Sequence, residues 1–150
     1  MTAGISAPDV DDLTAEAWRR IRSISEDPGV EAASHRVMHE TGLTGGPMKA
    51  LRFLPLTGSL PMRGLSARMG CDHSYVTSLV DTLEERGLAH RESHPTDRRV
   101  KVIVLTEEGR RLAGRVQRAY TTPPATFTVL SDAEVATLCD LLRKLDPAGD

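Results

Sequence analysis

Short hydrogen-bonding side chains gather in the first turns of segment 73–85, which the sequence predicts as a helix. Its apolar residues recur three and four positions apart, as on a buried helix face, and they are Val76, Leu79, Val80 and Leu83. The opposite face and its flanks carry His73, Ser74, Tyr75, Thr77 and Ser78. Such groups can reach phosphates and base edges in the DNA major groove. Since none of them is Arg, Asn or Gln, part of the sequence readout is expected from DNA shape.

A second group of charged residues lies between two strand-like runs, 88–93 and 100–105. The connecting loop reads His94-Pro95-Thr96-Asp97-Arg98-Arg99. A hairpin tip with paired arginines can enter the minor groove, where the negative potential attracts guanidinium groups. We expect Asp97 to orient a neighbouring arginine through a bidentate pair. The alternative interpretation, a solvated charged loop, is less favoured because this loop directly follows the polar helix.

The elements that must position these groups follow in a recognisable order. A short helix over 65–69, a tight turn at Gly70-Cys71 and an N-cap at Asp72 precede the polar helix, and the hairpin comes after it. A short strand is expected near Leu60. This order predicts a winged helix-turn-helix. The predicted fold class is therefore mainly α with a small β-wing.

Further helices flank this core. The chain predicts helices from Asp11 to the Asp27-Pro28-Gly29 break, over 30–41 up to Gly42, from Thr44 to Pro55, from Thr106 to Pro123-Pro124, and after a Ser131/Glu134 capping box. The predicted organisation is one integrated domain, with residues 1–8 disordered, 9–43 in the N-terminal interface helices, 44–106 in the DNA-binding core and 107–145 in the C-terminal interface helices.

The apolar stripes of the first and last helices lie outside the compact winged core. They are Leu13, Ala17, Ile21 and Ile24, with Trp18 alongside, and Val135, Leu138, Leu142 and Leu145. Pairing between two subunits would bury them, and two-fold dimers are the commonest solution. We therefore expect a homodimer. The alternative is a monomer whose terminal helices pack on its own core.

Composition limits the class of protein. The 150 residues carry a net charge of −2, with 39% hydrophobic and 27% charged residues, as in ordinary globular domains. Residues 61–120 hold 11 basic and 8 acidic side chains, so the surplus of cations lies in the predicted DNA-binding module. No apolar run approaches the ~18 residues of a membrane span, and no signal-peptide pattern begins the chain. We expect a cytoplasmic protein without a membrane partner.

Residues 43–109 resemble the MarR family of bacterial transcription regulators. The resemblance rests on Leu43-Thr44, Leu65-Ser66, Leu83-Glu84 with Gly87-Leu88, Asp97-Arg98-Arg99, and Leu105-Thr106 with Gly109. It implies a triangular homodimer, joined by its terminal helices, that binds a pseudo-palindromic double-stranded operator as a repressor. It also implies that Ser74, Tyr75, Thr77 and Ser78 face the major groove, while Arg99 enters the minor groove. Ser66 replaces a usual small apolar residue, and residues 27–29 interrupt what is often one longer helix.

The same resemblance implies an effector, often a small aromatic or anionic organic molecule, bound between the dimer arm and the winged core. His39, Met48 and Arg52 are the candidate ligand residues. Ordinary packing and a solvated arginine are the alternative interpretation of each. Binding of the effector is expected to release the DNA.

Metal sensing and thiol sensing are alternatives within the same fold. His35 and His39 stand four apart, a spacing that can hold zinc, but segment 107–120 contains no histidine to complete the site. Oxidant-sensing members carry a reactive cysteine in the first helix, and here Cys71 is the first cysteine of the chain. We expect Cys71 in the core and Cys139 in helix packing. No metal and no cofactor are therefore expected.

Two other function classes find less support. The sequence has no phosphate-cradling glycine loop, nucleophile elbow or metal quartet, so an enzyme is not expected. A winged-helix module for protein–protein contact would favour exposed apolar anchors on the outer helix face. The polar face and the basic loop indicate a DNA-binding regulator instead.

Overall fold

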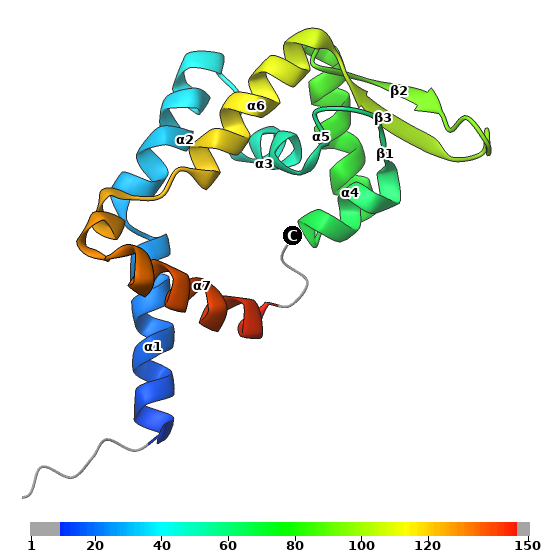
Figure 1. Cartoon of the computed structure of the whole chain (residues 1–150). Helices are drawn as coiled ribbons and strands as arrows, with labels where there is room; N and C mark the ends of the chain where they lie inside the picture. The colour runs from blue at the N-terminus through cyan, green and yellow to red at the C-terminus, as the bar shows by residue number, and fades with distance from the viewer. Residues whose placement is uncertain (1–9, 147–150) are drawn as a thin grey trace, which may run out of the picture.

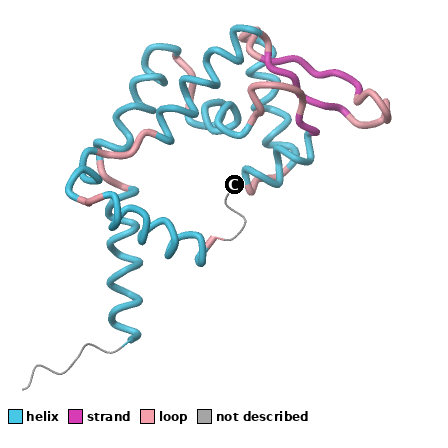
Figure 2. Tube along the Cα trace, in the orientation of Figure 1, coloured by secondary structure: helices cyan, strands magenta, loops and turns pink. Residues whose placement is uncertain are grey.

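A computed structural model describes residues 10–146 and arranges them as a mainly helical chain with one small sheet (Figures 1 and 2). The elements are α1 (Val10–Ser25), α2 (Pro28–Thr41), α3 (Gly45–Phe53), β1 (Leu60–Pro61), α4 (Met62–Met69), α5 (His73–Glu85), β2 (Ala89–Ser93), β3 (Lys101–Leu105), α6 (Glu107–Thr121), a 3₁₀ turn (Ala125–Val129) and α7 (Asp132–Leu145). This architecture confirms the predicted fold class. The predicted disorder of residues 1–8 lies outside the described residues.

Local sequence signals explain several helix boundaries. Gly42 and Gly70 end α2 and α4 in the left-handed conformation, with φ of 66° and 62°. Residues 27–29 end the first helix region and also begin α2. Asp27 is the N-cap of α2, and its Oδ1 accepts a hydrogen bond from the Gly29 N–H at 2.7 Å. The Ser131/Glu134 capping box begins α7 as predicted, and the Ser131 backbone N–H lowers the pKa of Glu134.

Two residues at predicted helix starts make no capping hydrogen bond. Thr44 and Asp72 stand at the N-cap positions of α3 and α5, with extended backbones, but neither side chain accepts a bond from its helix. Both helices therefore begin where the sequence predicted, without a side-chain capping hydrogen bond. Packing supplies the stability of these two helices instead, since the buried faces of α3 and α5 contact each other.

The winged core is built on a three-stranded antiparallel sheet in the order β1-β3-β2. Leu60 pairs with Ile103, and Ala89 pairs with Leu105, so the short strand expected near Leu60 forms one edge. The predicted α5 stripe is fully or almost fully buried and packs with α3 and α4. The hairpin of β2 and β3 projects from one end of the molecule, beside α5 (Figure 1). The fold thus presents the start of α5 and the hairpin tip on one surface.

Gly109 sits at the junction between the wing and α6. The Thr106 N–H donates to the Leu88 carbonyl at 3.0 Å, and the Thr106 hydroxyl donates to the Gly87 carbonyl at 2.7 Å. Thr106 also caps α6 by accepting from the Gly109 N–H. A Cβ on residue 109 would lie 1.7 Å from the Leu88 oxygen. The Leu-Thr-x-x-Gly pattern is therefore a structural joint that requires glycine.

The first and last helices leave their apolar stripes in solvent. Trp18 in α1 is 59% exposed and Leu145 in α7 is 74% exposed, and exposed large hydrophobic residues on these helices also include Leu13, Ile21, Ile24, Leu141 and Leu142. Helix α1 extends away from the body of the molecule, and α7 crosses beside the junction of α1 and α2 (Figure 1). A single chain therefore does not bury these stripes on its own core. No helix among the described residues has the length and hydropathy of a membrane span.

Candidate nucleic-acid interface

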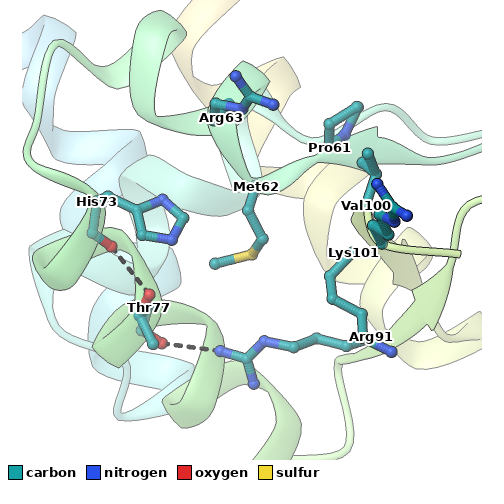
Figure 3. Close-up of a pocket in the computed structure, with 9 residues that line it drawn as sticks. Pro61, Met62, Arg63, His73, Thr77, Arg91, Val100 and Lys101 are labelled. Atoms are coloured by element: carbon teal, nitrogen blue, oxygen red, sulfur yellow. Dashed lines mark hydrogen bonds between the residues drawn. The ribbon is translucent and has the colours of Figure 1, made fainter. Parts of the chain in front are cut away.

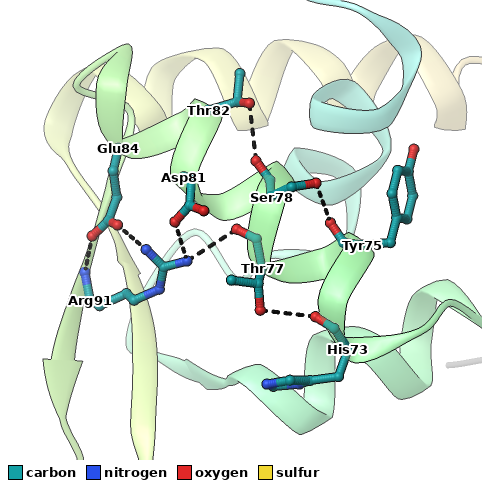
Figure 4. A network of polar contacts seen from close by, with 8 residues as sticks. All are labelled: His73, Tyr75, Thr77, Ser78, Asp81, Thr82, Glu84 and Arg91. Atoms are coloured by element: carbon teal, nitrogen blue, oxygen red, sulfur yellow. Dashed lines mark hydrogen bonds and ion pairs between the residues drawn. The ribbon is translucent and has the colours of Figure 1, made fainter.

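The polar side chains at the start of α5 share one surface. Val76 is fully buried on the core side, whereas His73, Ser74 and Ser78 are exposed and Thr77 is half-buried. Figure 4 shows His73, Thr77 and Ser78 along the outer side of the first two turns. The helix thus brings together the residues that its sequence periodicity placed opposite the buried stripe.

Two hydroxyl groups of this surface donate to their own helix. Thr77 Oγ1 donates to the His73 carbonyl at 2.9 Å, and Ser78 Oγ donates to the Tyr75 carbonyl at 2.8 Å. A hydroxyl that has donated its proton keeps lone pairs that can accept. In this arrangement Thr77 and Ser78 are suited to accept from base amino groups, which the major groove presents on adenine and cytosine.

Tyr75 lies apart from the other predicted contact residues. Its ring points toward the start of α3 (Figure 4), and a Cβ built on Gly46 would lie 2.7 Å from the Tyr75 hydroxyl oxygen. Tyr75 remains 48% exposed. The sequence placed Tyr75 on the flank of the polar face. Because Gly46 has no side chain, the Tyr75 ring can lie against α3 instead. Its position suits a contact at the edge of the surface.

The hairpin tip is organised through its backbone. The Asp97 carboxylate accepts a hydrogen bond from the Arg99 N–H at 3.0 Å, and the Asp97 carbonyl accepts from the Val100 N–H at 3.0 Å. The expected bidentate pair between Asp97 and an arginine side chain is therefore wrong. An aspartate two residues before its donor closes a local turn more readily than it reaches a guanidinium. Arg98 and Arg99 are exposed, and neither forms an ion pair within residues 10–146.

A groove of about 330 Å³ separates α5 from the wing. Pro61, Met62, Arg63, His73, Thr77, Arg91, Arg99, Val100 and Lys101 line it. Figure 3 shows Met62 at its centre, with Arg63, His73 and Arg91 around it. The end of β1, the first turn of α4, the start of α5, the two wing strands and the loop between them contribute these side chains. The groove therefore combines four cations from separate elements.

Arg63 and Lys101 were not among the sequence candidates. Arg63 makes no ion pair within the described chain, and Lys101 Nζ donates to the Ser93 hydroxyl at 3.1 Å. Pairing of β1 with β3 brings the start of α4 beside the wing, and this long-range contact has no local signature. The only sequence signal for these residues was the surplus of basic side chains over 61–120.

The three candidate ligand residues do not form one site. Met48 is fully buried in the core, His39 is exposed on α2, and Arg52 lines a separate cavity of about 340 Å³. The other residues lining that cavity are Ser25, Glu31, Ser34, His35, Met38 and Tyr120. Met48 therefore packs in the core, as its alternative interpretation held. His35, one helical turn before His39, lines the cavity, whereas His39 does not.

The cavity has an aromatic wall that the sequence did not indicate. The Arg52 guanidinium carbon lies 4.5 Å from the centre of the Tyr120 ring and 5.4 Å from that of Phe53. Such stacking leaves the ring and the guanidinium edge available to a planar anion. Tyr120 stands 68 positions after Arg52, so only the packing of α3 against α6 reveals this pair.

The histidine and cysteine residues form no metal centre in the part of the chain that is described. No group of three or more His, Cys, Asp or Glu side chains is arranged there to hold a metal ion. His35 instead lies 3.7 Å from Glu31 on the same helix. Cys71 is half-buried, with its Sγ 3.3 Å from the Met69 carbonyl. Cys139 is exposed on α7, so its expected packing is absent within one chain.

The chain is similar to known transcription regulators in sequence and in structure. A sequence model described as MarR family matches residues 43–101. The chain is 34% identical over 105 residues to a putative transcriptional regulatory protein for the hcr operon of Thauera aromatica, a match that covers 69% of this chain and 63% of that protein.

Two solved structures from Rhodococcus resemble most of the chain. A MarR-family transcriptional regulator from Rhodococcus sp. RHA1 is 31% identical, with a TM-score of 0.61 over 93% of this chain and 96% of that one. CouR from Rhodococcus jostii RHA1, bound to p-coumaroyl-CoA, is 32% identical, with a TM-score of 0.61 over 93% and 95%.

Proposed function

This chain belongs to the MarR family of transcription regulators, and on that premise we propose that it binds a pseudo-palindromic operator as a homodimer and represses transcription. Helix α5 enters the major groove with Ser74, Thr77 and Ser78, and Arg99 enters the adjacent minor groove from the wing. The observation that carries this proposal is the groove of about 330 Å³ between α5 and the wing, which collects cations from separate elements.

The positive charges of this groove suit the DNA backbone that runs between the major-groove contact of α5 and the minor-groove contact of Arg99. Arg63 and Lys101 flank the space through which a sugar-phosphate strand would pass from the major to the minor groove. Phosphate contacts fix the register of a protein on the duplex, and the short side chains of α5 then read base edges. His73 lines the same space and can donate to a phosphate oxygen.

The dimer follows from the exposed stripes of α1 and α7. Burying Trp18, Ile21 and Ile24 against the same helices of a second chain would remove an exposed apolar surface that a soluble protein rarely keeps. A two-fold axis between the terminal helices would place two copies of α5 on successive major-groove faces. The expected spacing of the half-sites is about one helical turn, 10–10.5 base pairs.

The direct test is fluorescence anisotropy with the DNA upstream of the protein's own reading frame, followed by footprinting. We expect a saturable complex and two protected half-sites. The combined variant Arg63→Ala, Arg99→Ala and Lys101→Ala should abolish binding, whereas Arg111→Ala should not, because Arg111 lies on α6 and pairs with Glu108. A wild-type protein that binds this and unrelated DNA equally would overturn the proposal.

The effector is proposed to bind the cavity of about 340 Å³ between α2, α3 and α6 and to release the operator. The stacked pair of Arg52 and Tyr120 supports a planar aromatic ligand with an anionic group. The similarity to CouR, whose structure holds p-coumaroyl-CoA, supports an aromatic acid or its thioester. Titration calorimetry with p-coumaroyl-CoA and with free p-coumarate tests this class.

The control for the effector is a pair of variants in the cavity. Arg52→Ala and Tyr120→Leu should weaken ligand binding but leave operator affinity in the absence of ligand unchanged, because both residues line a cavity to which no residue of α5 or the wing contributes. Ligand-dependent release of DNA that persists in both variants would place the effector elsewhere. Failure of both compounds to bind the wild-type protein would exclude this ligand class.

A further inference from the structure

Arg91 ties the wing to α5 through a set of contacts that involves three residues of that helix. Its Nη2 lies 2.7 Å from Asp81 Oδ1 and donates to the Thr77 carbonyl at 3.1 Å, while its Nη1 pairs with the Glu84 carboxylate (Figure 4). The Arg91 side chain is only 23% exposed. One guanidinium therefore bridges β2 to the middle and the end of the helix.

Glu84 holds the backbone of β2 as well as this side chain. Its Oε1 accepts a hydrogen bond from the Arg91 N–H at 2.7 Å. Strand β2 is an edge strand, paired with β3 alone, so its outward N–H groups have no strand partner. The Glu84 carboxylate fills that position at residue 91, and the wing is thereby fixed to α5 from the main chain and from the side chain.

The charge of Arg91 is already compensated within the protein. Arg91 lines the same groove as Arg63, Arg99 and Lys101, but it differs from them because two carboxylates contact it. Turning its guanidinium toward a phosphate would leave Glu84, a partly buried carboxylate, without its partner, and an unpaired charge of that kind is unfavourable. The geometry therefore separates Arg91 from the cations that face the groove freely.

We propose that Arg91 is a positioning residue, which sets the angle between the wing and α5 so that both DNA grooves are engaged by one rigid unit. This inference rests on the proposed DNA binding. Contact in two grooves demands a fixed separation between the start of α5 and the tip at Arg99. A wing that is free to swing loses conformational entropy on binding, and that loss lowers affinity.

Glu84→Gln gives the sharpest test, because the two possible roles of Arg91 predict opposite changes in operator affinity. A positioning role predicts operator binding weaker by about tenfold, since one of the two ion pairs that hold Arg91 is lost. A phosphate-contact role predicts equal or tighter binding, because the change removes a negative charge near DNA and frees Arg91. Equal or tighter binding by a folded Glu84→Gln protein would overturn the proposal.

Variants of Arg91 itself supply two further readouts. Arg91→Met should weaken binding by about tenfold without changing the dependence of affinity on salt concentration, whereas loss of a phosphate contact lowers that slope by about 1. Arg91→Lys should not restore affinity, because an ammonium cannot reproduce the forked contact with Asp81 and Glu84. A reduced salt slope, or full rescue by lysine, would assign Arg91 to a phosphate.

A measurement without DNA separates this inference from the proposed function. Amide hydrogen exchange at Arg91 should be faster in Glu84→Leu, which removes the acceptor for the Arg91 N–H, than in the wild-type protein, while exchange at Val80 in the core of α5 should be unchanged. Unchanged exchange at Arg91 would show that Glu84 does not hold the wing, and the inference would fail. If the wild-type protein binds no DNA, the proposed function fails, and the role of Arg91 in DNA binding fails with it.

Discussion

The carboxylate of Asp97 contacts Arg99 through the backbone: its Oδ1 accepts the Arg99 N–H at 3.0 Å. Asp97 therefore shapes the turn from which Arg99 projects and leaves the guanidinium of Arg99 free. This arrangement explains how an acidic residue can stand at the tip of a wing that is proposed to approach phosphates. Its contribution to the turn and its repulsion of DNA act in opposite directions, so variants can separate them.

Replacement of Asp97 tests which of these two effects is larger. Asp97→Ala removes the acceptor for the Arg99 N–H and should weaken operator binding by about 1 kcal/mol, the typical contribution of one hydrogen bond. Asp97→Asn keeps an acceptor oxygen and removes the charge, so it should bind at least as tightly as the wild-type protein. Anisotropy titrations of both variants measure the difference. Tighter binding by Asp97→Ala would mean that repulsion dominates.

Arg99→Ala tests the minor-groove contact. The side chain is exposed and forms no ion pair within the described residues, so its removal should leave the thermal midpoint unchanged. Operator affinity should fall by about 1–3 kcal/mol, and the salt slope should fall by about 1. Arg111→Ala is the matched control on α6. Unchanged affinity in a folded Arg99→Ala protein would exclude the proposed insertion.

The orientation of α5 is tested by a pair of substitutions two positions apart. Ser78→Glu places a negative charge on the exposed face, so it should abolish DNA binding and change stability by no more than about 0.5 kcal/mol. Val76→Asp buries an unpaired charge at a site with no exposure and should unfold the module. Thermal denaturation and anisotropy together distinguish the two effects. Normal binding by Ser78→Glu, or a stable Val76→Asp, would reverse the assigned faces.

The proposed dimer is tested on α7. Light scattering of the wild-type protein should give twice the 16.3 kDa chain mass at micromolar concentration. Leu142→Glu should give the mass of one chain without unfolding it, because Leu142 is 40% exposed in a single chain. Lys144→Ala on the same helix serves as the control and should remain dimeric. A monomeric wild-type protein, with and without operator DNA, would refute the assembly.

The joint between the wing and α6 should not tolerate a side chain. Gly109→Ala would place a methyl group 1.7 Å from the Leu88 oxygen, so the backbone must move, and we expect a loss of about 3 kcal/mol in the free energy of unfolding. Gly45→Ala is the matched control, because no atom lies within 4 Å of its Cβ position. Urea denaturation of both proteins measures this contrast. Equal stability of the two variants would contradict the close approach at Gly109.

The local periodicity of apolar residues, together with residues that cap or end helices, was sufficient to predict most helices and strands. The α5 stripe, the glycine ends at Gly42 and Gly70 and the capping box at Ser131 depend on residues within one or two turns, so neighbouring positions specify them. Thr44 and Asp72 stand at the predicted helix starts but make no capping hydrogen bond, because a cap side chain must also adopt the right rotamer, and residue type alone does not fix the rotamer.

The sequence by itself determined the order of helices and strands, the buried face of α5 and the polar residues opposite it, because these follow from spacing along one helix. Only the tertiary structure decided which distant residues come together: Arg63 and Lys101 around one groove, Arg52 on Tyr120, and Arg91 with Glu84 and Asp81. It also removed Met48 from the ligand site and turned Tyr75 toward Gly46. The reason is physical: side-chain contacts across elements depend on how whole faces pack, and that arrangement is a property of the complete core.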